Sequence, residues 1–467
     1  MHAALWLVAL PIGVAPIVYI LRKKMAGALL AAVIVFFATW LTMRMPTDAL
    51  INVLGRTIEL DQLSKLTLAL LFAATATLFL TLAFHRGERK SESLRHEARI
   101  FYPAALVILA CFSAAGLSRH LGIAAIFIEL AAILAVFVIQ TERLESTRAA
   151  LRFLVLFSLA TPLFLLAAWQ IDVYQLSGGL ITEAQLERTA LFVGLGFAVW
   201  LAVVPFHSWL TSTAIESTPP MAAFVLTTFP VIAFSTFIHL LIDLPWLVDS
   251  SFLVSAIIVA GVFTAFVGGV MAAVQRGFSE LLGYSALFNL GCILVILGIG
   301  GRAAVVTILA SLVVRSAALV LIAASTVALH IRITNDGFSQ VRGIVWQMPV
   351  ATAGLVVGGL TLAGMPLTAG FPPYWQLLSS IAQVDERGLV LIVIGGLGVT
   401  TGYLRGFRAM LAPVSRLGIK LRWQEPWPLL VIISILGLFC LLSGLFPSLL
   451  IEPLQEITAG ISFPIRN

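Results

Sequence analysis

The sequence predicts an all-α polytopic membrane protein with about fourteen transmembrane helices. Of its 467 residues, 60% are hydrophobic and 11% are charged, whereas a soluble domain is about 45–50% apolar and about 25% charged. Apolar runs of about 20 residues, enough for a helix to cross a bilayer, recur along the whole chain. The runs lack the short polar–apolar alternation of β-barrel strands. This composition excludes a soluble globular protein and also a disordered one.

The apolar runs are expected to be helices, because backbone groups in lipid must bond within their own segment. The first run continues into a polytopic chain and is therefore not interpreted as a cleaved signal peptide. The fourteen runs cover residues 3–21, 25–43, 63–84, 101–117, 120–140, 150–171, 189–210, 217–244, 251–275, 281–300, 303–331, 349–383, 387–411 and 426–451.

The distribution of basic residues predicts the orientation. If the N-terminus lies outside, 18 of the 28 Lys and Arg residues fall on cytoplasmic loops, seven on outer loops and three within spans. Membrane proteins concentrate positive charge on the cytoplasmic side. We therefore expect a multi-pass protein of the cell inner (plasma) membrane with both termini outside. The net charge of +6 is attributed to this asymmetry and not to nucleic-acid binding.

No cofactor, metal or nucleotide site is predicted. The chain has neither a GxxxxGK[ST] phosphate loop nor a dinucleotide-binding fingerprint. The three cysteines, Cys111, Cys292 and Cys440, lie in apolar runs without CxxC spacing, so zinc and iron–sulfur clusters are not expected. His207 and His239 are too scattered to suggest paired haem ligands, and His239 is expected at the membrane interface.

Two of the runs are expected to be broken helices. The seventh contains Pro205, which removes a helical hydrogen bond and clashes with the preceding turn. The twelfth is too long for one straight crossing and carries Gly364, Pro366 and Gly370 near its centre. Unwound backbone at membrane depth survives only where it is buried or lines a cavity. Two breaks five spans apart predict an inverted repeat with a transport path at each break.

These segments resemble a known family. The motifs are Val-Pro-Phe-His-Ser-Trp-Leu at 204–210, Ser-Thr-Pro-Pro-Met-Ala-Ala at 217–223, Leu-Gly-Tyr-Ser at 282–285, Leu-Ala-Gly-Met-Pro at 362–366 with Gly-Phe at 370–371, and Ile-Glu-Leu-Asp-Gln-Leu-Ser at 58–64. Their order is similar to that in the antiporter-like, proton-conducting membrane subunits of respiratory complex I (NADH:quinone oxidoreductase) and of Mrp-type cation/proton antiporters. The resemblance covers nearly the whole chain.

The resemblance implies a division into four parts. Residues 1–100 would hold the first three helices, and residues 101–244 a first five-helix repeat with its break around Pro205. Residues 251–411 would form a second five-helix repeat with its break around Pro366, followed by a C-terminal helix at 426–451.

Glu129 is the main candidate for proton exchange. It stands in the middle of the fifth run, where a carboxylate is costly and is by default functional. The alternative is a structural carboxyl group bonded to a neighbouring hydroxyl. The resemblance implies a lysine partner on the seventh helix. Glu216, expected in a loop open to water, would be the contrasting carboxylate.

The chain departs from the residues that the family uses as a relay. The position of the seventh-helix lysine, five residues before Pro205, holds Trp200. The eighth-helix histidine position holds Leu226, and the central lysine of the eleventh helix is Arg315. Arginine stays protonated and cannot pass a proton on. His207 lies beside the first break, where it either ends a helix without further function or shuttles protons near neutral pH.

The resemblance implies a subunit that translocates protons, or exchanges cations for protons, along a reduced path. Two alternatives stay open: a non-pumping structural subunit of the same complex, and a proton-conducting partner of an inorganic-carbon uptake complex. Within complex I the chain would be a NADH:quinone oxidoreductase (translocase) subunit without a redox centre of its own. Its expected partners are other membrane subunits, the lipid bilayer, and protons or monovalent cations, but not nucleic acid.

Overall fold

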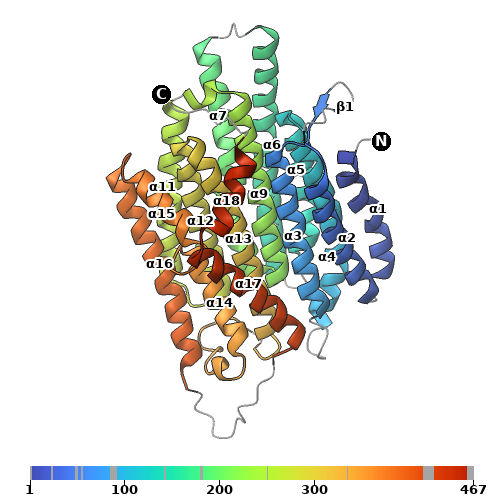
Figure 1. Cartoon of the computed structure of the whole chain (residues 1–467), viewed down its shortest axis with the longest axis vertical. Coiled ribbons are helices and arrows are strands. Elements are labelled where there is room, and N and C mark those ends of the chain that lie inside the picture. The colour runs from blue at the N-terminus through green and yellow to red at the C-terminus, as the bar shows by residue number, and fades with distance from the viewer. Residues whose placement is uncertain are drawn as a thin grey trace.

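The computed structural model describes residues 3–22, 25–47, 51–53, 56–84, 92–140, 144–178, 182–249, 251–333, 335–413 and 425–459. These residues form a bundle of helices that run roughly side by side along the long axis of the molecule (Figure 1). In that view α1 to α4 lie on one side, α15 and α16 on the other, and α9 and α13 between them.

Helices make up almost all of the described secondary structure. In the first half they are η1 (Ala3–Leu5), α1 (Trp6–Leu21), α2 (Met25–Arg44), α3 (Gln62–Phe84), α4 (Glu92–Leu117), α5 (Leu121–Ile139), α6 (Leu144–Leu176), α7 (Glu183–Trp200), α8 (Ser208–Glu216), α9 (Pro219–Asp243) and α10 (Trp246–Asp249). In the second half they are α11 (Ser251–Val274), α12 (Phe278–Ile299), α13 (Arg302–Leu329), η3 (Ile344–Trp346), α14 (Pro349–Leu362), α15 (Phe371–Ile381), α16 (Glu386–Leu411), α17 (Trp427–Leu445) and α18 (Ser448–Thr458).

One small β-hairpin interrupts the helical pattern. Strands β1 (Ile51–Val53) and β2 (Arg56–Ile58) pair antiparallel, with Asn52 opposite Thr57. Directly after the hairpin, the Glu59 N–H donates to the carbonyl oxygen of Leu117 at 3.0 Å, which ties the start of α3 to the end of α4.

The multi-pass membrane architecture expected from composition is confirmed. Among the described residues, eleven helices are long and apolar enough to cross a membrane. Each expected run has a helical counterpart, but α1 and α14 are apolar and shorter. The first turns of α7 carry Glu183, Glu187 and Arg188, so its apolar part alone is short.

Three helices extend well beyond the expected apolar runs. The helix α4 begins at Glu92 instead of residue 101, and α6 is 33 residues long, about 50 Å. The helix α7 begins at Glu183, where a capping box between Thr182 and Gln185 satisfies the first backbone N–H groups. Helices can continue past the lipid because water replaces lipid around polar side chains. The expected loops at 85–100 and 172–188 are therefore partly helical.

The centre of the bundle is formed by α9 and α13. In each, 89% of the residues in the most apolar stretch are buried, against 22% in the peripheral α17. Because α9 belongs to the first half of the chain and α13 to the second, the two halves meet at this pair of helices.

Several of the basic residues that predict the orientation lie outside the described residues. They include Lys23, Lys24, Arg86, Arg89, Lys90, Arg143, Arg416, Lys420, Arg422 and Arg466.

Candidate functional site

The first break separates α7, which ends at Trp200, from α8, which begins at Ser208. Within it Ala202 adopts a left-handed backbone conformation with φ of 54°, and the peptide bond before Pro205 is cis. The Val204 N–H, which no longer has a helical acceptor, donates to Thr264 Oγ1 on α11 at 3.2 Å. A side chain of the second half therefore holds the break of the first half.

His207 occupies the N-cap position of α8. Its ring is half-buried, and Nδ1 has no hydrogen-bond partner among the described residues. The backbone carbonyl of His207 accepts from the Leu210 N–H at 3.1 Å. The backbone carbonyl thus takes part in the first turn of α8, and the ring Nδ1 can bind a water molecule or a proton.

The second break separates α14, which ends at Leu362, from α15, which begins at Phe371. Pro366 lies within it and is exposed. Gly364 has φ of 71°, and a Cβ atom at Gly370 would lie 1.9 Å from the Thr361 carbonyl oxygen. Only glycine fits both positions, the first because of its backbone conformation and the second because of its close contact. The Ala369 N–H donates to the Cys440 carbonyl oxygen at 2.6 Å, so α17 supports this break.

Glu129 on α5 is held by two hydroxyl groups of α6. Ser158 donates to its Oε1 at 2.6 Å and Thr161 to its Oε2 at 2.9 Å. The carboxyl group is half-buried, Ser158 is exposed, and the neighbouring Ile126 is 54% exposed on the outer surface of the bundle. Glu129 therefore faces the seam between α5 and α6 and the surroundings of the subunit, and Trp200 is not among its hydrogen-bond partners.

Aromatic rings fill the interior of the first half where the family relay would stand. Trp200 is 1% exposed, and its ring centroid lies 4.1 Å from that of Phe164 and 5.8 Å from that of Phe197. Its indole N–H has no partner among the described residues. We call the connected rings of α6 to α9 the Trp200 aromatic cluster: Phe153, Phe157, Phe164, Phe197, Trp200, Trp209, Phe229 and Phe237. None of these side chains can carry a proton at neutral pH.

Arg315 on α13 is fully buried at the meeting point of the two halves. Its Nη1 donates to the Ala286 carbonyl oxygen at 2.8 Å, and its Nη2 donates to the Leu226 carbonyl oxygen at 3.2 Å. Asn289 Oδ1 lies 3.4 Å from Nη1, and Nε is without a partner among the described residues. The guanidinium is thus bonded only to neutral oxygens and joins α9, α12 and α13.

Leu226 takes part in this contact through its backbone. Its apolar side chain is buried. Pro230 stands four residues later in α9 and has no N–H, so the Leu226 carbonyl lacks its helical donor. The Leu-x-x-x-Pro spacing was the sequence signal for a free carbonyl at this depth, although nothing in the sequence named Arg315 as its donor.

A polar cluster at the end of the bundle where α5 begins was not anticipated. Arg119 contacts three carboxylates: Nε lies 3.2 Å from Glu59, Nη2 lies 3.4 Å from Asp61 and Nη1 lies 3.6 Å from Asp243. Asp61 also bonds His239 Nε2 at 2.9 Å. Burial would raise the pKa of Asp61, but the hydrogen bond and charge of His239 and the Ser64 bonds together hold it well below its usual range.

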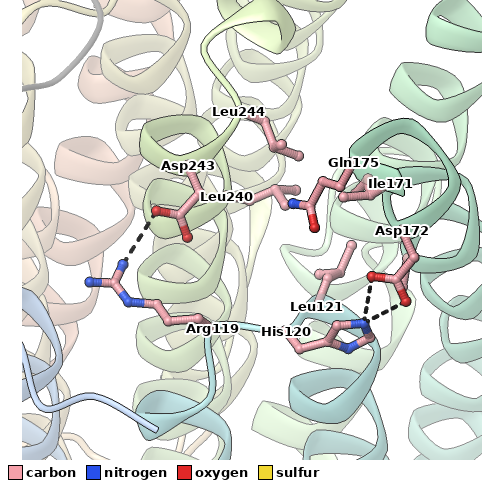
Figure 2. A pocket seen from close by; sticks show the side chains of 10 residues that line it. Arg119, His120, Leu121, Ile171, Asp172, Gln175, Leu240, Asp243 and Leu244 are labelled. Carbon is pink, nitrogen blue, oxygen red and sulfur yellow. Dashed lines mark hydrogen bonds and ion pairs between the residues drawn. The ribbon is translucent and has the colours of Figure 1, made fainter. Parts of the chain in front are cut away.

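A cavity of about 240 Å³ opens beside this cluster. Figure 2 shows Asp172 and Asp243 on opposite sides of it, with Gln175 reaching between them. His120 Nε2 lies 3.2 Å from Asp172, which links the start of α5 to the end of α6. The only sequence signal was the acidic segment at 58–64, because Arg119, Asp172 and Asp243 come from separate parts of the chain.

The expectation for Glu216 was wrong. It ends α8 with only 17% of its side chain exposed, and its Oε2 accepts from the Ala149 N–H at 2.9 Å. The carboxylate binds the backbone of α6 and does not lie in a loop open to water.

No metal centre is found within the part of the chain that the structure describes, where no group of three or more His, Cys, Asp or Glu side chains could hold an ion. His239 is mostly buried and ion-paired to Asp61.

The comparisons with known proteins agree on one family. Residues 118–400 match the family described as NADH:quinone oxidoreductase/Mrp antiporter, TM. NADH-quinone oxidoreductase subunit N of Acinetobacter baumannii is 26% identical over 330 residues, which cover 67% of this chain and 66% of that protein, just under two thirds of its length.

Two solved structures share the fold. A chain of the Mrp complex from a Dietzia species matches with a TM-score of 0.82 and 16% identity, over 98% of this chain and 97% of that one. A chain of respiratory complex I from Thermus thermophilus matches with a TM-score of 0.76 and 19% identity, over 97% of this chain and 99% of that one.

Proposed function

Because the chain belongs to the NADH:quinone oxidoreductase/Mrp antiporter transmembrane family, we propose that it is a proton-translocating membrane subunit of a complex I-like or Mrp-like assembly. The observation that carries the proposal is Glu129, a carboxylate in the middle of α5 that two hydroxyl groups hold in place. A carboxyl group at membrane depth can take up and release a proton, and its retention there favours a role in transport.

The surroundings of Glu129 also favour a place within an assembly. Ser158 is exposed beside it, and large apolar side chains such as Ile126 and Leu130 are exposed around it. A polar group in contact with lipid is unfavourable. A membrane subunit that packs against α5 and α6 would cover Glu129 and its two hydroxyl partners.

The proton path in this subunit differs from a line of central lysines. The Trp200 aromatic cluster excludes a titratable group from the centre of the first half. Arg315 supplies a fixed positive charge in the second half, because a guanidinium does not release its proton. His207 is the remaining candidate near the first break, through Nδ1, which has no hydrogen-bond partner among the described residues.

The architecture that goes with this function has fourteen crossings in two inverted five-helix repeats. In its support, α4 to α9 and α11 to α16 follow the same order of three helices, one broken helix and one further helix. The four parts would be residues 1–100, 101–244, 251–411 and 426–451, with breaks around Pro205 and Pro366. Both termini would face the outside of the plasma membrane.

A structural, non-pumping subunit is the second candidate. The observation in its favour is the apolar packing around Trp200, whose buried indole has no bonding partner among the described residues. A proton-conducting partner of an inorganic-carbon uptake complex would share the fold, and copurification of a large zinc protein with the tagged chain would distinguish it.

The test is proton flux across proteoliposomes that contain the full chain, followed with an internal pH-sensitive dye. We expect Glu129→Gln to lower the flux about tenfold or more. Asp385→Asn is the matched control, because Asp385 caps α16 far along the chain and asparagine caps equally well. Flux that is absent from the wild type, or unchanged in Glu129→Gln, would overturn the proposal.

A further inference from the structure

The helices α5 and α6 meet in an antiparallel seam with polar groups at two levels. At the end of the bundle, His120 bonds Asp172. Further in, Glu129 bonds Thr161 and Ser158. Between these levels Gly122 lies against Ala168, where an added Cβ would be 3.2 Å from the alanine methyl.

One face of α6 carries this arrangement. Its residues are spaced three and four apart, so they line a single stripe of the helix. The stripe consists of Ser158, Thr161, Leu165, Ala168, Asp172 and Gln175. It is polar at both ends and apolar in the middle. Ala168, Asp172 and Gln175 line the cavity, whereas Thr161 and Ser158 hold Glu129.

The cavity has the size and the lining of a water-filled vestibule. Its volume of about 240 Å³ is far above the minimum of roughly 15 Å³ for a water molecule. His120 Nδ1 accepts from the Ile123 N–H at 3.3 Å, so Nε2 carries the proton that is donated to Asp172. The Asp172 carboxylate thus accepts from His120 at the wall of the cavity.

The charges around the cavity favour positive ions. The titratable groups that face it or its rim are Glu59, Asp61, Arg119, His120, Asp172, His239 and Asp243. Four carboxylates lie here with one guanidinium and two imidazoles, so the four negative charges exceed the positive ones even if both histidines are protonated. A negative, hydrated mouth raises the local concentration of protons.

We propose that this cavity is the proton-exchange mouth of Glu129, and that the α5–α6 seam carries protons past the Trp200 aromatic cluster. The inference rests on the proposed function and specifies its route. A hydrated proton enters the cavity and is taken up by Asp172. It then moves through water to the Glu129 carboxylate, which becomes a neutral carboxyl group, while Asp172 returns to its charged form. Under the proposed topology the mouth opens to the outside.

On this route we expect Leu165 to be the barrier between the two levels. Ala168 at the cavity lies seven positions after Thr161 at Glu129, which is about 10 Å along the helix. Leu165 is the one stripe residue between them and is 42% exposed. Water has to pass this single apolar turn, so a larger side chain there would slow proton exchange. Leu166, 45% exposed on the same helix, points about 100° away and provides a matched control.

The experiment measures the protonation of Glu129 itself. Full-length protein in liposomes is exposed to an outside pH jump, and the carboxyl C=O stretching band that disappears in Glu129→Gln is followed by time-resolved infrared spectroscopy. We expect Asp172→Asn and Leu165→Trp each to slow the appearance of this band about tenfold, whereas Leu166→Trp and Asp385→Asn leave it unchanged.

The outcomes separate the route from the function. Wild-type rates in both Asp172→Asn and Leu165→Trp would overturn the route, even if proton flux still depends on Glu129. Slowing by Leu166→Trp equal to that by Leu165→Trp would also overturn it, because the effect would then be general. An absence of flux in the wild type would overturn the proposed function, while the infrared rates would still decide whether the cavity exchanges protons with Glu129.

Discussion

Arg315 Nη2 donates a hydrogen bond of 3.2 Å to the backbone carbonyl oxygen of Leu226. The bond joins the central helix of the second half to the central helix of the first half. It is possible because Pro230 removes the N–H that would otherwise bond this carbonyl. Arg315 therefore acts as a fixed connection between the halves, at a position where the family resemblance suggested a proton relay.

Replacing Arg315 by lysine should destabilise the protein by about 1–3 kcal/mol. The two Nη atoms donate to Ala286 on α12 and Leu226 on α9 from a rigid planar fork, and a single ammonium nitrogen does not reproduce the geometry of both bonds. Thermal unfolding of the purified protein in nanodiscs measures the effect. An unchanged Tm in Arg315→Lys would contradict the connecting role.

Phenylalanine at position 200 should leave proton flux unchanged, whereas lysine at that position should change it. Trp200→Phe keeps an aromatic ring in the cluster and loses an indole N–H that has no partner among the described residues, so flux should stay within error. The smaller ring leaves a cavity, so a modest loss of Tm is expected. Trp200→Lys places a titratable group among aromatic rings, and we expect a lower Tm together with increased proton flux. Trp200→Lys with a lower Tm and no gain in flux would show that the rings are not what limits conduction.

The second break should be sensitive to one methyl group. A Cβ atom at Gly370 would lie 1.9 Å from the Thr361 carbonyl oxygen, so Gly370→Ala should cost about 1–3 kcal/mol. Gly437 in α17 has nothing within 4 Å of the equivalent position, and alanine there should be neutral or stabilising. Comparing the two Tm values tests whether the break is held in this conformation.

The Asp61–His239 pair predicts a dependence of stability on acid. The pKa of Asp61 is lowered in the folded protein. The contribution of this carboxylate to stability is therefore fully present above its pKa in the unfolded chain, about 3.9. This stabilisation is lost as the pH falls below about 4, toward the pKa of Asp61 in the folded protein. Between about pH 5 and about pH 3, the Tm of the wild type should therefore fall more steeply than the Tm of Asp61→Asn. Parallel curves would refute the stabilising role of this carboxylate.

The topology can be tested with single cysteines, because the three native cysteines are buried. With both termini outside, a membrane-impermeant thiol reagent added to intact cells should modify a cysteine at Glu183, at the start of α7, but not one at Ser93, at the start of α4. Labelling of the Ser93 position alone would invert the proposed orientation.

Much of the fold was predictable because a membrane imposes a strong one-dimensional constraint. Runs of about 20 apolar residues must become helices, and the segments around Pro205 and from Gly364 to Gly370 predicted the two breaks. A proline alone does not predict a break, because Pro162 and Pro230 lie inside α6 and α9. Helix ends were less predictable, as α4 and α6 show, because polar residues such as those after Glu92 continue a helix in water without any hydropathy signal.

The sequence by itself determined the membrane class, the two breaks, the position of Glu129 in mid-helix, and the apolar or aromatic side chains at Leu226 and Trp200. Only the tertiary structure decided what surrounds each of them. It placed Glu129 on the α5–α6 seam, filled the interior of the first half with aromatic rings from four helices, and assembled Arg119 with acids from separate segments. The physical reason is that hydropathy depends on each segment alone. Hydrogen bonds and ion pairs depend instead on which helix surfaces come into contact after packing.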